Sequence, residues 1–68
     1  MKPYDQVQRE IQNILDKIAR ANASIARHEA QDVPDKLALI QYGEMKGQLT
    51  EQLLVLLAEM DIRLSLAA

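Results

Sequence analysis

Residues 31–35 read Gln-Asp-Val-Pro-Asp and separate two long stretches of helix-forming sequence. Proline has no amide hydrogen to donate, and it pushes the residue before it out of the α-helical region, so a helix is expected to end here. Asp32 is placed to cap a second helix, with Pro34 in its first turn and Asp35 favoured there by the helix dipole. The segment therefore predicts a turn at about residues 31–33.

The stretch before this turn, about residues 4–30, has the pattern of a helix that packs against another helix. Apolar side chains recur at alternating intervals of four and three residues, which places them on one face. These residues, the first half of a predicted hairpin seam, are Val7, Ile11, Ile14, Ile18, Ala21 and Ile25. Leu15 widens this stripe on one side.

The stretch after the turn, about residues 34–66, predicts a second and longer helix. Its half of the seam is Tyr42, Met45, Leu49, Leu53, Leu56, Met60 and Leu64. At about 1.5 Å per residue, the first helix spans roughly 40 Å and the second roughly 50 Å. The second helix is therefore expected to extend beyond the first.

The short connection favours antiparallel neighbours, because only a few residues join the two helices. The predicted fold class is all-α: a single antiparallel two-helix hairpin over residues 1–68, resembling a short coiled coil. The alternative is one long helix kinked at Pro34, which would place Asp32 and Asp35 in the core.

The second helix also carries a further face of small or apolar residues, about 120° from its seam. This second face consists of Ile40, Gly43, Gly47, Thr50, Leu54 and Leu57. The first helix can cover only the seam, and a contiguous exposed apolar patch normally marks an interface. The pattern predicts an oligomer, most simply a homodimer that forms a four-helix bundle, or else a heterologous helical protein as the partner.

The two glycines of the second face support an interface. Inside a helix each glycine costs about 1 kcal/mol relative to alanine. Gly43 and Gly47 lie four residues apart, which would allow another helix backbone to approach closely. The alternative interpretation is a flexible stretch near the start of the second helix.

Charge and hydropathy exclude two classes of partner. The net charge is −2, and no run of basic residues suggests nucleic-acid binding. The longest apolar run, residues 53–58, is far shorter than the roughly 20 residues that span a bilayer. The N-terminal residues lack the apolar stretch of a signal peptide, so a cytoplasmic location without membrane attachment is expected.

No residue pattern indicates catalysis or a cofactor. His28 is the only histidine and there is no cysteine, so a metal site within one chain is not expected. Ser24, Thr50 and Ser65 have no histidine at a spacing typical of an activated nucleophile. His28 is expected to be half exposed, with its ring hydrogen-bonded to a carbonyl or carboxylate of the turn.

Acid and base residues four positions apart are expected to support the exposed helix faces with weak ion pairs. These pairs are Asp5 with Arg9, Asp16 with Arg20, Asp32 with Lys36, and Glu59 with Arg63. The sequence thus predicts a small, non-enzymatic, self-associating helical module for interaction or structure. The alternative function is a co-chaperone or adaptor subunit that holds a partner's helix on the second face.

Overall fold

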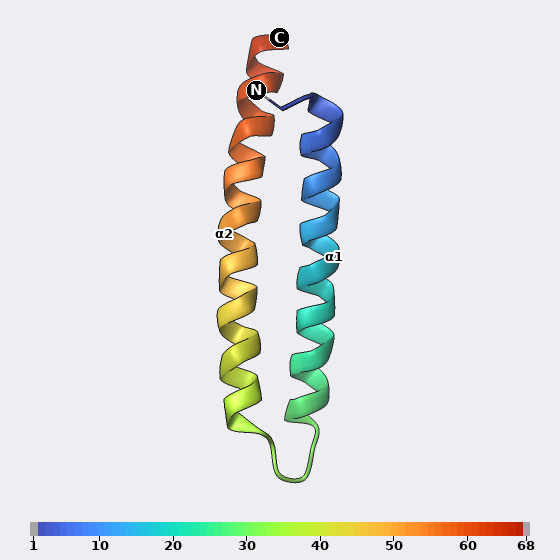
Figure 1. The fold of residues 1–68 in the computed structure, drawn as a ribbon, viewed down its shortest axis with the longest axis vertical. Coiled ribbons are helices and arrows are strands. Elements are labelled where there is room, and N and C mark those ends of the chain that lie inside the picture. The colour runs from blue at the N-terminus through green and yellow to red at the C-terminus, as the bar shows by residue number, and fades with distance from the viewer. Residues whose placement is uncertain (1, 68) are drawn as a thin grey trace.

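The chain forms an antiparallel hairpin of two α-helices, α1 (Tyr4–Glu29) and α2 (Lys36–Ala67), joined by residues 30–35 (Figure 1). The computed structural model describes the backbone of residues 2–67 and the side chains of residues 2–62. The hairpin is a rod 53 Å long and 17 Å wide, and the C-terminal end of α2 projects beyond the start of α1 (Figure 1). The single helix kinked at Pro34 is therefore wrong.

The α1 helix begins directly after Pro3. The amides of Gln6 and Val7 donate to the Pro3 carbonyl at 3.0 and 3.1 Å, and Pro3 provides no side-chain cap. At the other end, the Ala30 amide donates to the Ala26 carbonyl, and Ala30 keeps right-handed helical angles. The helix thus ends without the left-handed residue that often closes a helix.

The start of α2 differs from the prediction by two residues. Its capping residue is Asp35, not Asp32: Asp35 Oδ1 accepts a hydrogen bond from the Ala38 amide at 3.1 Å. Pro34 consequently lies before the helix and not in its first turn. Both aspartates have the capping chemistry, but the turn needs residues 30–35 to reverse the chain, and this leaves the later aspartate at the helix start.

The core is thin and lies along the contact between the two helices. Its buried members are Val7 and Ile14 from α1 and Leu49 and Leu56 from α2. Ile11, Ile18, Leu53 and Met60 pack against this cluster and are partly buried. Two helices share a single line of contact, so little more of their surface can be removed from water.

Burial follows the predicted seam at most of its positions. Ala21 is also buried, and Ile25 and Tyr42 are partly buried. Met45 differs from the prediction, because its side chain is 42% exposed at the edge of the contact. Leu64 lies outside the residues whose side chains the structure describes.

Candidate interaction surface

The two helices distribute their apolar residues differently. The α1 helix is strongly amphipathic, whereas α2 is more hydrophobic overall and has apolar residues around most of its circumference. A helix of the first kind needs one neighbour, and a helix of the second kind is normally covered on several sides. In the hairpin, only α1 covers α2, so the candidate surface is the uncovered part of α2.

The second face of α2 is exposed along its whole length. Ile40, Leu54 and Leu57 are 58%, 61% and 44% exposed, and Thr50 and both glycines are exposed as well. Neighbouring residues of this face are three or four positions apart in the sequence, which places all six on one side of the helix. The hairpin thus presents a continuous strip of apolar and small residues to solvent.

The packing of α1 on α2 does not require the glycines in this strip. A Cβ atom built on Gly43 or Gly47 would have no neighbouring atom within 4 Å. Both residues also have ordinary helical backbone angles, because no positive φ occurs among the described glycines. Alanine would therefore fit at both positions in the single hairpin and would favour the helix by about 1 kcal/mol at each.

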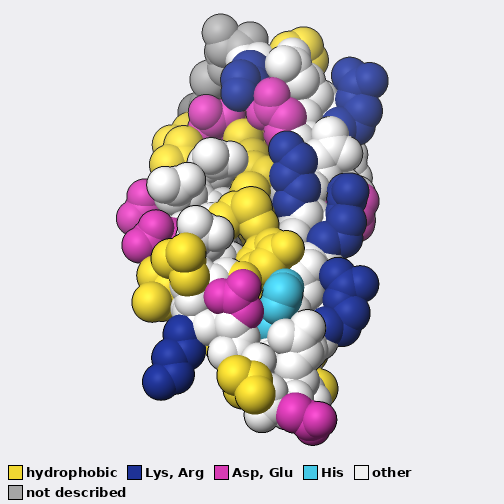
Figure 2. Space-filling view, turned by 60° about the horizontal axis from the view of Figure 1, so that its bottom comes forward, with side chains coloured by type: hydrophobic (Ala, Val, Ile, Leu, Met, Phe, Trp, Pro, Cys, Tyr) yellow, Lys and Arg dark blue, Asp and Glu magenta, His cyan; other side chains and the backbone are white. Residues whose placement is uncertain are grey.

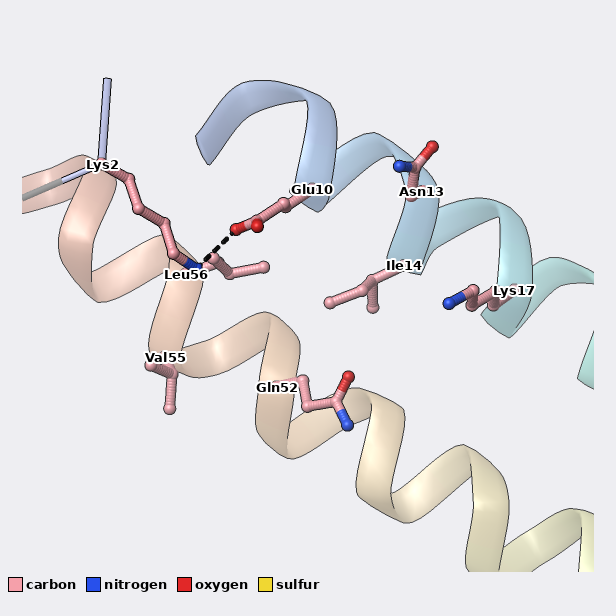
Figure 3. Close-up of a pocket in the computed structure, with 8 residues that line it drawn as sticks. All are labelled: Lys2, Glu10, Asn13, Ile14, Lys17, Gln52, Val55 and Leu56. Atoms are coloured by element: carbon pink, nitrogen blue, oxygen red, sulfur yellow. Dashed lines mark hydrogen bonds and ion pairs between the residues drawn. The ribbon is translucent and has the colours of Figure 1, made fainter. Parts of the chain in front are cut away.

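A groove between the helices lies on another side of α2, and it has a mixed polar and apolar lining. It is open to solvent and encloses about 430 Å³. Its lining residues are Lys2, Glu10, Asn13, Ile14, Lys17, Gln52, Val55 and Leu56 (Figure 3). Because successive residues of a helix are about 100° apart, Leu54 is turned away from the groove that Val55 lines.

The surface of the hairpin is not uniform in charge. On the face shown in Figure 2, Lys and Arg side chains line the α1 side, while hydrophobic side chains gather between the helices and over α2. This separation matches the amphipathic pattern of α1 and the apolar circumference of α2. The uncovered apolar area of the molecule thus belongs mainly to α2.

Lys2 and Glu10 form the ion pair at one end of the groove. Lys2 Nζ lies 2.9 Å from Glu10 Oε2, and the N-terminal residues run from α1 toward α2 (Figures 1 and 3). The hydrogen bond from Lys2, together with its charge, lowers the pKa of Glu10. The same hydrogen bond raises the pKa of Lys2. The two residues are eight positions apart, so helix periodicity gave no signal for this pair.

The predicted i, i+4 ion pairs do not form where the structure describes both side chains. Arg20 donates to the backbone carbonyl of Asp16 at 3.4 Å, while the Asp16 carboxylate accepts from Gln12. The prediction for Asp32 with Lys36 is wrong because Asp32 lies in the turn, outside both helices. Arg63 lies outside the described side chains.

His28 packs against Tyr42 across the hairpin. Their ring centroids are 5.5 Å apart, and the ring planes are tilted by 35°. His28 Nδ1 is buried and has no hydrogen-bond partner among the described residues, so the expected bond to the turn is wrong for this atom. The ring therefore contributes to the end of the core mainly through its contact with the tyrosine.

The described part of the chain has neither a candidate metal site nor a candidate membrane span. No three residues of the types His, Cys, Asp and Glu come together there in a way that could hold a metal ion. Neither helix, over its described residues, combines the length and apolar character needed to cross a bilayer.

No family model, curated protein or solved structure matches this chain. The function is therefore inferred from the chemistry and geometry of the surface itself.

Proposed function

We propose that this protein is a small helical interaction module that associates with itself through the second face of α2. The observation that carries the proposal is the exposure of Ile40, Leu54 and Leu57 in one continuous strip that α1 does not cover. Single exposed apolar residues are common on protein surfaces, but Leu54 and Leu57 adjoin on one side of α2, and adjoining exposed apolar residues mark interfaces. A two-fold dimer of hairpins would place four helices around one core.

The small core of the hairpin supports the same conclusion. Four buried side chains, Val7, Ile14, Leu49 and Leu56, form its central cluster. A short chain buries a smaller fraction of its surface on folding than a larger domain does, so a core of this size leaves a small margin of stability. Chains of this size commonly gain the missing stability by oligomerisation. Association through α2 would extend the core without changing the contact between α1 and α2.

The glycines support a helical partner on this face. Gly43 and Gly47 weaken α2 by about 1 kcal/mol each relative to alanine, and the hairpin itself gains no contact from them. Small residues four apart allow two helix backbones to approach closely. A partner helix that uses this space would explain why α2 has glycine at both positions.

The test is the mass of the isolated chain of residues 1–68, measured by light scattering and sedimentation equilibrium over a range of concentrations. Self-association predicts a dimer that dissociates on dilution and a melting temperature that rises with concentration. A helical monomer that melts cooperatively at every concentration would contradict the proposal. A partly unfolded or aggregating chain would also contradict it, and would favour an adaptor that needs a different protein to cover α2.

A further inference from the structure

We infer that two copies pair their α2 helices antiparallel, with Lys36 of each copy opposite Asp61 of the other. This inference rests on the self-association proposed above and adds the identity, direction and register of the partner helix. It follows from the order of residues along the second face and from the charges at its two ends.

The second face has a charged residue at each end. Lys36 lies four residues before Ile40, and Asp61 lies four residues after Leu57, so both continue the same side of α2. Along the extended strip, the intervals are four, three, four, three, four, three and four residues. This series is identical in both directions. A second copy that runs antiparallel can therefore match the strip position by position, with the two-fold axis between residues 48 and 49.

One of the matched pairs is complementary in size. In this register the facing pairs are Lys36 with Asp61, Ile40 with Leu57, Gly43 with Leu54, and Gly47 with Thr50. Each pair occurs twice in the dimer, as an isologous interface requires. The Leu54 side chain, which is 61% exposed in the hairpin, meets a glycine whose Cβ direction is empty. A large side chain thus faces an open position on the other copy.

The charges at the two ends select the antiparallel direction. Lys36 and Asp61 are both exposed, and within the described residues neither has an ion-pair partner. Antiparallel pairing brings the lysine ammonium of one copy to the aspartate carboxylate of the other at both ends. Parallel pairing would place lysine opposite lysine and aspartate opposite aspartate, and would also align Leu54 with Leu54 and Gly43 with Gly43. Like charges that face each other are unfavourable, which disfavours the parallel arrangement.

The register can be tested by disulfide cross-linking, because the chain has no cysteine of its own. Two variants of the whole 68-residue chain are prepared, one with Ile40→Cys and one with Leu57→Cys. In the inferred register, these positions face each other between copies and come within reach of a disulfide. Two copies of the same variant would have their cysteines about 25 Å apart along the helix, which no disulfide can bridge.

The expected result is a cross-linked dimer on a non-reducing gel when the two variants are mixed and oxidised mildly. Each variant oxidised alone should give no such dimer. Gln41→Cys, on another side of α2, mixed with Leu57→Cys is the matched control and should not cross-link. Light scattering on the reduced samples establishes separately that dimers are present.

The possible outcomes distinguish the inference from the proposed function. Dimers that cross-link within a single variant would overturn the antiparallel direction and leave self-association standing. Dimers that cross-link in none of the mixtures would overturn the register, again without removing self-association. A parent chain that stays monomeric at the same concentrations would overturn both.

A charge exchange provides an independent test. Asp61→Lys places like charges at both ends of the antiparallel pair, and it should weaken the dimer about tenfold at low salt. Adding Lys36→Asp to the same chain restores opposite charges and should recover most of this loss. If the second substitution does not recover affinity, residue 36 of one copy does not lie opposite residue 61 of the other.

Discussion

Replacing Leu54 and Leu57 by glutamate is expected to dissociate the proposed dimer without directly disturbing the contact between α1 and α2. The two side chains are 61% and 44% exposed in the single hairpin, so α1 gains little from their outward surfaces. Glutamate and leucine also have similar helix propensities. The effect on the isolated hairpin should therefore be small, and the main effect should fall on association.

The magnitude follows from the area that a dimer would still bury. Full burial of a leucine contributes about 1.5–3 kcal/mol, and roughly half of each of these side chains remains in water, which leaves about 1 kcal/mol per side chain. The double substitution changes four side chains in each dimer. It should therefore remove about 4 kcal/mol, which corresponds to a roughly thousandfold increase in Kd.

The matched control uses two apolar residues of α2 that do not belong to the second face. Val55 and Ile62 are 62% and 55% exposed, and Val55 lines the groove instead (Figure 3). The Val55→Glu, Ile62→Glu double variant should keep the parent's Kd, because it adds the same charge away from the interface. Sedimentation equilibrium gives the Kd of all three chains, and circular dichroism shows whether each remains helical.

Two results would refute the reasoning. The first is an unchanged Kd for the Leu54→Glu, Leu57→Glu chain. The second is an equal loss of affinity in the control, which would mean that added negative charge weakens association wherever it lies on α2. Loss of affinity in the first chain alone supports the second face as the interface.

Three further substitutions test the hairpin itself. Ile14→Ala should lower the free energy of unfolding by about 2–5 kcal/mol, because the buried isoleucine leaves a cavity in the core; urea titration followed by circular dichroism measures this. Asp35→Ala should cost about 0.5–2 kcal/mol in the same assay, because the Ala38 amide loses its cap. The control for the cap is Asp32→Ala in the exposed turn, and an equal cost there would contradict the assignment of Asp35 as the capping residue. Lys2→Ala should return the pKa of Glu10 to its usual range, which a titration followed by NMR can show. Because the Lys2 hydrogen bond lowers this pKa in the folded chain, the ion pair stabilises the fold above the ordinary carboxyl pKa. That contribution is lost as the pH falls through the lowered value, and a Glu10 pKa that stays low in the variant would contradict the assigned cause.

The two helices and their contact could be predicted from the sequence because a regular apolar repeat at helical spacing places its members on one face, which must pack against another helix. Val7, Ile14, Leu49 and Leu56 recur at helical spacing, and these residues form the buried cluster. Boundary details were harder to predict. Asp32 and Asp35 have the same capping chemistry, and the choice between them depends on the path of the turn, which local propensity does not describe.

Contacts that are not periodic in the sequence escaped prediction. The Lys2–Glu10 pair depends on the N-terminal residues running toward α2, and no spacing rule connects two residues eight positions apart. The exposure of the Met45 side chain depends on how α1 and α2 are rotated relative to each other about their line of contact. From the sequence, the second face is only a set of residues on one side of the second helix. The structure adds that α1 leaves those residues in solvent.

The thin central cluster has a consequence for how the protein behaves in a cell. If the second face completes the core only when two copies meet, then the folded fraction depends on how much of the chain is made. Dilution would then act on this protein much as a denaturant does, and proteases would remove copies that remain alone. Expression level would set both the amount of the protein and the share of it that survives.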